Sequence, residues 1–179
     1  CSSDLVRCFC KTYVSFYRGT PLLVQLILIF YALPTVGITL SPLLAAVVAL
    51  SLNTAAFQGE ILRAGFKMLP KGQLEAARDF GFSAAQTLFY IQMPQVLRAM
   101  IPALINETID IIKNSALVSV VAVHELMRVT QTLASTTYRP LEFYTACGLL
   151  YFLTSWGLSI VGTRLEKNRS SSAQRVLAQ

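Results

Sequence analysis

The chain contains 179 residues, of which 54% are hydrophobic and only 13% are charged. Soluble domains usually contain about 25% charged residues, so the composition excludes an ordinary soluble domain and indicates a polytopic membrane protein. The net charge of +6 fits basic loops that orient such a protein in the bilayer better than a nucleic-acid-binding surface.

The N-terminal segment contains three of the four cysteines, Cys1, Cys8 and Cys10, and the fourth is Cys147. No CxxC pair is present, and the single histidine is His124. This set is too sparse to predict a zinc site or any other metal site. The cysteines are interpreted as free thiols on a reducing cytoplasmic side.

Four apolar segments are close to the roughly 20 residues that a helix needs to cross a bilayer core. They are residues 22–40, 43–61, 101–123 and 143–161. The third is interrupted by ionisable residues, whereas the fourth contains no charge. The sequence therefore predicts an all-α polytopic helical bundle that forms one transmembrane domain over residues 1–179.

Basic residues predict how these spans are oriented. If both chain ends are cytoplasmic, 12 of the 15 Lys and Arg residues lie on that side, as the positive-inside rule requires. They precede the first span, separate the second from the third, or follow the fourth: Arg7, Lys11, Arg18, Arg63, Lys67, Lys71, Arg78, Arg98, Arg164, Lys167, Arg169 and Arg175.

The segment 63–98 is expected to be a cytoplasmic loop with its own helices. Pro70 and the good helix formers 73–78 predict a first short helix, which Gly81 should end. A loop of this length is uncommon unless it is functional. The spacing alone allows either an amphipathic hairpin on the bilayer surface or a docking element for a cytoplasmic partner.

A second short helix is predicted directly after the glycine turn. Ser83 and Gln86 have the spacing of a capping box, which marks a helix N-terminus. Pro94 is expected to terminate that helix, and Pro94 and Pro102 would then separate the loop from the third span.

Polar and ionisable residues interrupt the third span at helical spacing: Asn106, Glu107, Asp110, Lys113, Asn114 and Ser115. Residues 107, 110 and 114 share one helix face, which 106, 110 and 113 overlap. Ionisable groups within a span are costly, usually face the bundle interior and are functional candidates by default.

Two structural alternatives involve Lys113. It could pair with Glu107 or Asp110 on its own helix, or with Glu60 at the inner end of the second span. Neither pairing neutralises more than one carboxylate. With Glu60 included, three acids would face one lysine, and that surplus suits the passage of a zwitterion or a cation.

The loop sequence "EAARDFGFSAAQTLFYIQMP" follows the signature of bacterial ABC importer permeases. That signature reads Glu-Ala-Ala, three residues, Gly, nine residues, then Ile-x-Leu-Pro, and here Met93 replaces the Leu. Four further segments resemble permeases for polar amino acids of the histidine, glutamine and arginine type: YRGTPLLVQL (17–26), GEILRAG (59–65), NSALVSV (114–120) and YRPLEFYTA (138–146). The resemblance covers about residues 13–167.

The resemblance implies the transmembrane domain of a type I ABC importer with a two-helix coupling loop. Glu75 would offer its carboxylate to a cleft of the ATPase, while Ala76 and Ala77 would allow close approach. Gly81 would set the turn between the helices, and Pro94 closes the signature. Because such permeases usually have five spans, a first span is expected to precede residue 1.

The resemblance also implies that the third predicted span holds substrate through Asn106, Lys113 and Ser115. Glu107 and Asp110 go beyond the family pattern and favour a basic amino acid such as arginine, lysine or histidine. Asn114 and Glu60 complete the expected substrate-binding set.

Further expectations follow from the resemblance. The chain itself should have no catalytic residue, metal or cofactor, since ATP and Mg would bind to two partner ATP-binding subunits. A second permease subunit, identical or similar, and an extracytoplasmic amino-acid-binding protein would complete the complex. The expected location is the bacterial inner membrane, with the C-terminus cytoplasmic and no contact with nucleic acid.

Two other classes of membrane protein are alternatives to a permease. An intramembrane enzyme could use Glu107 and Asp110 as an acid–base pair, but these carboxylates lie one turn apart on one face and no nucleophile–base set accompanies them. An ion-coupled secondary carrier would often contain internal repeats with broken helices, and the sequence has no such repeat. The permease interpretation is favoured over both.

Overall fold

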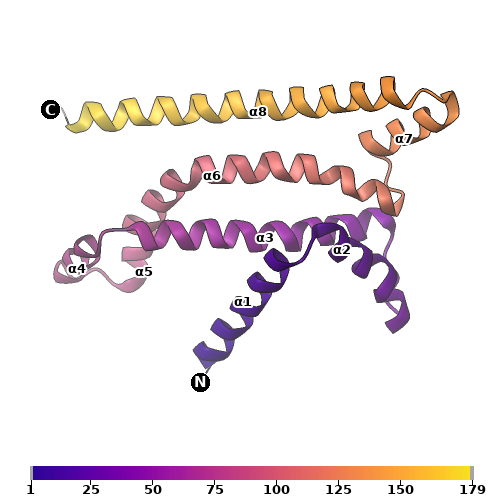
Figure 1. Ribbon diagram of the computed structural model, residues 1–179. Coiled ribbons are helices and arrows are strands. Elements are labelled where there is room, and N and C mark those ends of the chain that lie inside the picture. Colours follow the sequence, from indigo (N-terminus) through magenta and orange to yellow (C-terminus); the bar gives the residue numbers. More distant parts are fainter. Residues whose placement is uncertain (1, 178–179) are drawn as a thin grey trace.

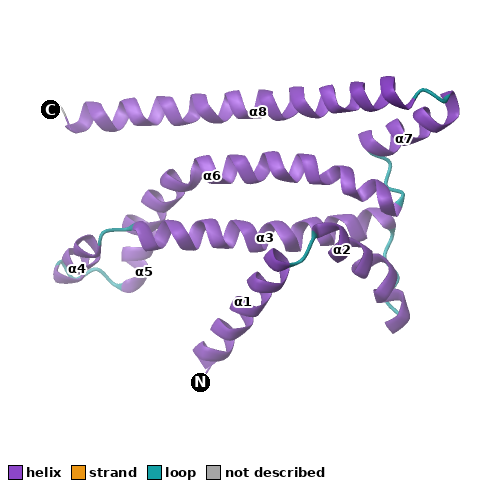
Figure 2. Ribbon diagram, viewed as in Figure 1, coloured by secondary structure: helices purple, strands orange, loops and turns teal. Residues whose placement is uncertain are grey.

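The computed structural model describes the backbone of residues 2–177 and the side chains of residues 4–164. All regular elements in this part of the chain are helices (Figure 2). Three long helices run side by side, and α6 (Met93–Asn114) lies between α3 (Pro42–Met68) and α8 (Pro140–Leu177) (Figure 1). The predicted all-α helical bundle is confirmed.

Three helical segments are long and apolar enough to cross a membrane: Pro42–Met68, Ala84–Val121 and Pro140–Arg164. They overlap the predicted segments 43–61, 101–123 and 143–161. The first predicted span, 22–40, folds differently. There, α2 (Leu22–Ile27) continues through η1 (Leu28–Ala32) and η2 (Leu33–Val36), so the helical run ends at Val36.

A sharp bend separates this run from α1 (Ser2–Gly19), and the angle between the two segments is 108°. The bend lies at Thr20–Pro21, where Pro21 has an extended backbone. A residue before proline avoids the helical region, so the chain cannot continue α1 through this point. Together the two segments could form one broken span or a re-entrant loop.

Buried polar side chains fix this bend against α3. The Gln25 amide donates to the Thr20 hydroxyl (2.8 Å) and to the Tyr17 carbonyl (2.9 Å). The Asn53 amide of α3 donates to the Gln25 side-chain oxygen (3.0 Å). Buried amides are stable only when they are hydrogen-bonded, so this cluster specifies one arrangement of α1, α2 and α3.

Helix α3 presents small residues to its neighbours. It begins at Ser41, whose hydroxyl accepts from the Leu44 N–H, with proline at the first helical position. Ala46 and Ala49 pack with Leu26, Val118 and Val121 in the main apolar cluster. Their small side chains allow α2 and η4 (Ser115–Val121) to approach α3 closely.

Two glycines hold α6 close to the helices on either side of it. A Cβ atom added at Gly65 of α3 would lie 2.7 Å from Met100 Cγ and 2.8 Å from Val96 Cγ1. A Cβ atom added at Gly162 of α8 would lie 2.8 Å from Ile105 Cγ2. Helix α6 is therefore packed on two sides without room for larger residues at these contacts.

The final connection folds back onto α8. Glu125 caps α7 (Leu126–Thr137) by accepting from the Met127 and Arg128 N–H groups at 2.7 and 2.6 Å. Tyr151 of α8 donates its hydroxyl to the same carboxylate at 2.9 Å. One acidic side chain thus both begins α7 and attaches it to α8.

Candidate functional site: the polar stripe of helix α6 and the α4 loop

A stripe of polar residues runs along the second half of α6 and onto η4, and we call it the polar stripe. It consists of Asn106, Glu107, Asp110, Lys113, Asn114 and Ser115. Asn106, Asp110 and Lys113 are exposed, while Glu107, Asn114 and Ser115 are half-buried. Val96 and Met100 lie beside Gly65 of α3 and share a helix face with Glu107 and Asn114, so the stripe runs from the α3 side of α6 onto its exposed side.

One ion pair lies within the polar stripe. The Lys113 ammonium is 2.6 Å from Asp110 Oδ1, and both side chains are 54% exposed. This is the i, i+3 pairing that was one of the structural alternatives. Glu107 makes no hydrogen bond or ion pair with any residue whose side chain the structure describes. The stripe therefore holds one paired carboxylate and one unpaired carboxylate.

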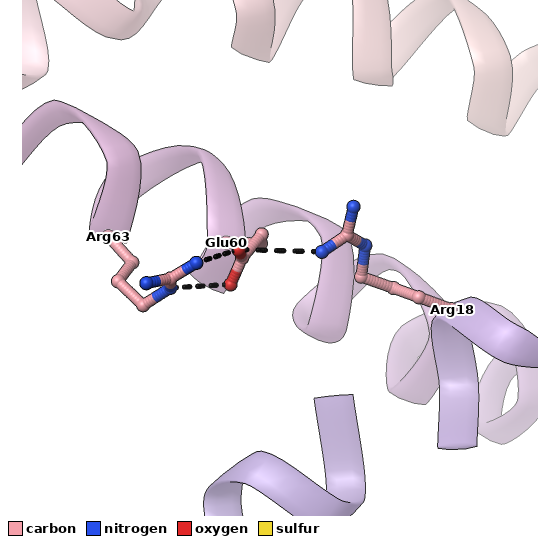
Figure 3. A network of polar contacts seen from close by, with 3 residues as sticks. All are labelled: Arg18, Glu60 and Arg63. Carbon is pink, nitrogen blue, oxygen red and sulfur yellow. Dashed lines mark hydrogen bonds and ion pairs between the residues drawn. The ribbon is translucent and has the colours of Figure 1, made fainter. Parts of the chain in front are cut away.

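The alternative pairing of Lys113 with Glu60 is wrong. Glu60 lies on α3 and binds the guanidinium of Arg63 one turn further along, with Arg63 Nε donating to Oε2 at 2.7 Å and Nη2 to Oε1 (Figure 3). Arg18 of α1 approaches Glu60 Oε1 to 3.5 Å from the other side (Figure 3). Two arginines satisfy Glu60, so it adds no surplus negative charge for a substrate.

The predicted glycine turn of the loop is confirmed in detail. Helix α4 (Lys71–Asp79) ends at Phe80, and Gly81 has φ of +77°, where glycine is unstrained. The Gly81 N–H donates to the Arg78 carbonyl (2.9 Å) and the Phe82 N–H to the Ala77 carbonyl (3.0 Å). These two bonds form a Schellman motif, which satisfies the last carbonyls of α4.

The predicted capping box is confirmed as well. The Ser83 N–H donates to Gln86 Oε1 (2.8 Å), and the Gln86 N–H donates to the Ser83 hydroxyl (3.3 Å). These two hydrogen bonds mark the N-terminus of α5 (Ala84–Gln86). Both ends of the loop's turn are therefore fixed by hydrogen bonds between residues a few positions apart.

Pro94 does not end the second loop helix, so that prediction is wrong. The chain passes from α5 through η3 (Thr87–Gln92), a π-helical segment, directly into α6, and Pro94 and Pro102 both lie within this helical run. Proline removes one helical hydrogen bond and clashes with the preceding turn. The wider π-helical turn just before Pro94 accommodates it. The second loop helix, α5, and the polar stripe thus belong to one continuous helical run, whereas α4 lies before the turn at Gly81.

The side chains of α4 divide into an exposed set and a buried one. Glu75 and Ala76 are exposed, whereas Ala77 is buried where α4 packs on η3. Ala77 therefore packs on the inside of the loop, next to the exposed Glu75 and Ala76. Phe80 is 84% exposed at the end of α4, and it is not among the residues that the loop signature specifies.

Comparison with known proteins identifies the family. The sequence profile of the "Binding-protein-dependent transport system inner membrane component" family matches residues 2–170. The chain belongs to this family. It is 40% identical over 158 residues to the L-cystine transport system permease protein TcyB of Bacillus subtilis (strain 168), covering 88% of this chain and 68% of that one. The arginine transport system permease protein ArtQ of the same organism is 37% identical over 161 residues, covering 89% and 74%.

Solved structures agree with this assignment. The crystal structure of an amino acid ABC transporter with histidines superposes with a TM-score of 0.87 at 36% identity, covering 94% of this chain and 78% of that one. The inward-facing MetNI methionine ABC transporter superposes with a TM-score of 0.77 at 21% identity, covering 93% and 76%, and supports the fold alone.

These findings confirm the family resemblance that the loop signature indicated. The chain is an amino acid ABC importer permease, a transporter subunit of the inner membrane and not an enzyme. In this family ATP is used by partner ATPase subunits, and the fold is that of a type I importer transmembrane domain.

Proposed function

We propose that this permease imports basic amino acids and that the polar stripe of α6 contacts them during passage. The observation that supports this most is the charge of the stripe, where two carboxylates, Glu107 and Asp110, accompany a single lysine. Lys113 already pairs with Asp110, so Glu107 remains to attract a cation. Because ionisable groups in a span commonly mark substrate pathways, this imbalance favours arginine, lysine or histidine.

The other stripe residues suit the remaining groups of an amino acid. The amides of Asn106 and Asn114 can both donate and accept, and so can the Ser115 hydroxyl. The Lys113 ammonium is a donor for the substrate's α-carboxylate, while Asp110 can accept from its α-ammonium. Glu60 is left out of this proposed set because Arg18 and Arg63 already bind it.

A second permease subunit is expected to cover the polar stripe. Exposed charges such as Asp110 and Lys113 would be costly against lipid, and charged side chains in spans usually face the bundle interior or a water-filled cavity. Two facing stripes would form a polar path between two permease subunits. We include two ATP-binding subunits and an extracytoplasmic binding protein in the proposed complex.

We propose that α4 docks into the ATPase subunits and transmits their movement to α6. Glu75, Ala76 and Phe80 are exposed on this helix. The fixed turn at Gly81 and the continuous run from α5 into α6 would carry a displacement to the polar stripe without an intervening break, although Pro94 lies on that route. In this arrangement α4 and the C-terminus face the cytoplasm.

Substrate competition tests the first proposal. The full complex would be reconstituted in proteoliposomes, and uptake of labelled arginine measured with and without ATP. We expect uptake to require ATP and to be competed by lysine and histidine at concentrations where glutamine and cystine have little effect. Stronger competition by glutamine or cystine would contradict the basic substrate, and uptake driven by an ion gradient without nucleotide would contradict the ABC mechanism.

A separate measurement tests coupling. Replacing Phe80 with Ser, or Glu75 with Gln, should reduce the stimulation of ATP hydrolysis by the binding protein while leaving the amount of permease in the membrane unchanged. Leu153→Ala, at an exposed position on α8, is the control variant. Unchanged stimulation in both variants would contradict docking through α4.

A further inference from the structure

Helix α1 has two distinct faces. With about 100° between successive residues, one face collects large apolar side chains that are between 49% and 74% exposed: Leu5, Val6, Phe9 and Phe16. The opposite face collects the basic residues Arg7, Lys11 and Arg18, together with Cys8 and Ser15. A strongly amphipathic helix with Lys and Arg on its polar face is typical of segments that lie in a membrane interface.

Two contacts with α3 fix the direction of these faces. The Tyr13 hydroxyl, on the apolar side of α1, donates to the Leu52 carbonyl at 2.5 Å. Arg18, on the basic side, reaches Glu60 at 3.5 Å and lies over the Phe57 ring. Leu52 and Glu60 are eight residues apart on α3, about 12 Å along its axis. Because Glu60 is the nearer to the α4 loop, the basic face points toward the membrane surface that bears α4.

The rest of α1 leaves the bundle. The 108° bend and the hydrogen bonds of Gln25 with Thr20 and Asn53 fix its C-terminal end, while its N-terminal half diverges from α3 (Figure 1). Leu5 and Phe9 therefore have little cover among the residues that the structure describes. Such an apolar face on a membrane protein needs a hydrophobic neighbour.

We propose that α1 is an interfacial anchor that inserts its apolar face into the lipid leaflet on the α4 side and places Arg7 and Lys11 among anionic phospholipid headgroups. Two features of the helix support lipid as its occupant over a second protein surface. Its orientation sends apolar side chains toward the bilayer interior and basic ones toward the surface, and the basic face complements anionic lipid. The identification of this leaflet as the cytoplasmic one rests on the proposed function.

Two positions on opposite faces of α1 provide a matched pair of probes. Phe9 is exposed on the apolar face and Lys11 is exposed on the basic face, because two positions along a helix correspond to a rotation of about 200°. Lipid insertion should therefore bury a label at position 9 while leaving a label at position 11 in water.

The experiment uses the full chain in vesicles of phosphatidylethanolamine and phosphatidylglycerol. Both variants first lose the native cysteines (Cys1→Ser, Cys8→Ser, Cys10→Ser, Cys147→Ala). One then adds Phe9→Cys and the other adds Lys11→Cys, each carries a nitroxide spin label, and the accessibility of the label to oxygen and to a water-soluble nickel chelate is measured. We expect oxygen to dominate at position 9, with a depth of about 5–10 Å, and the nickel chelate to dominate at position 11.

Two further variants separate lipid from other occupants. Leu5→Ser combined with Phe16→Ser should shift the label at position 9 from oxygen toward the nickel chelate. Arg7→Gln combined with Lys11→Gln should produce a smaller shift in the same direction, and replacing phosphatidylglycerol with phosphatidylcholine should mimic it.

Two results would overturn the proposal. A label at position 9 that is shielded from both reagents would show that protein covers the face, either a second copy or another part of the polypeptide. Equal nickel accessibility at positions 9 and 11 would place α1 in water. Neither readout depends on substrate or nucleotide, so a failure of the proposed function would leave this result unaffected, and the reverse also holds.

Discussion

Glu60 and the polar stripe are two acidic regions within membrane-spanning helices, and their surroundings differ. Glu60 belongs to α3, and its side chain is 24% exposed. Arg63 of the same helix and Arg18 of α1 both bind it. Asp110 is 54% exposed on α6, and its ion-pair partner among the described residues is Lys113. One region holds two cations for one acid, and the other holds two acids for one cation.

The difference indicates how to interpret an acidic residue in a span. A carboxylate that arginines of two helices bind is part of the structure, because it joins those helices and retains no charge to offer. A carboxylate with no hydrogen bond or ion pair among the described residues, such as Glu107, remains available to a cationic ligand. Hydropathy cannot separate these cases, since it counts Glu60 and Glu107 alike.

The largest loss of stability is expected from substitutions that push α6 away from α3 or α8. The packing of α6 against these helices determines the orientation of the polar stripe. Gly65→Ala would bring a Cβ within 2.8 Å of Val96 Cγ1, and Gly162→Ala within 2.8 Å of Ile105 Cγ2. We expect each to destabilise the protein by about 1–3 kcal/mol through overpacking, as measured by denaturant unfolding in detergent.

Gly59→Ala and Gly157→Ala are the matched controls, since nothing lies within 4 Å of a Cβ at either position. We expect no loss of stability from them, because alanine favours the helix over glycine by up to about 1 kcal/mol. A similar loss in all four variants would contradict the role of Gly65 and Gly162 as close-contact positions.

Neutralising one acid in each region should separate structure from transport. Glu60→Gln leaves Arg18 and Arg63 facing each other without a carboxylate, so we expect a clear fall in melting temperature in detergent. Asp110→Asn removes a single exposed ion pair, and such pairs contribute little to stability, so its melting temperature should stay close to that of the unaltered chain. The reverse order of the two melting temperatures would invalidate the distinction between the regions.

Lys113 and Glu107 should shift substrate preference in opposite directions. Glu107→Gln removes the unpaired acid and should weaken the apparent affinity for arginine roughly tenfold, as expected for loss of a charged hydrogen bond. Lys113→Gln frees Asp110 and should increase the preference for arginine over glutamine severalfold, because the lost contact with the α-carboxylate is common to both substrates and cancels in that ratio. Apparent KM values for uptake into proteoliposomes measure both effects, and shifts of the same sign would argue against charge as their cause.

The smallest effect is expected at the capping box, which lies outside both acidic regions. Ser83→Ala removes the hydroxyl that accepts from the Gln86 N–H and should cost about 1 kcal/mol of local stability. Faster hydrogen exchange over residues 84–92 would report that loss. The ratio of arginine to glutamine uptake should not change, and a changed ratio would mean that the loop influences substrate choice directly.

The parts of the fold that the sequence predicted correctly depend on local interactions. The turn at Gly81 and the capping box of Ser83 and Gln86 are fixed by bonds across three to five residues, so their spacing predicts them. Apolar length likewise predicted α3 and α8, because crossing a bilayer sets a minimum number of residues.

The errors arose partly where distant residues decide the outcome and partly at local features that the sequence did not reveal. The bend between α1 and α2 depends on Asn53, which meets Gln25 from another helix. Pro94 is tolerated within a helix because the π-helical segment before it removes the clash. Arg63, three residues after Glu60, was a partner that helical spacing could have indicated. Arg18 is distant from Glu60 in the sequence and lies on another helix, so helical spacing could not predict its ion pair with Glu60.

The most direct test of the central claim compares Glu60→Gln with Glu107→Gln in the reconstituted transporter. Uptake of labelled arginine and glutamine would be measured for each variant at equal amounts of permease. We expect Glu107→Gln to lose the preference for arginine, and Glu60→Gln to keep that preference while total uptake falls. A preference that changes in Glu60→Gln and persists in Glu107→Gln would contradict the assignment of the polar stripe as the substrate path.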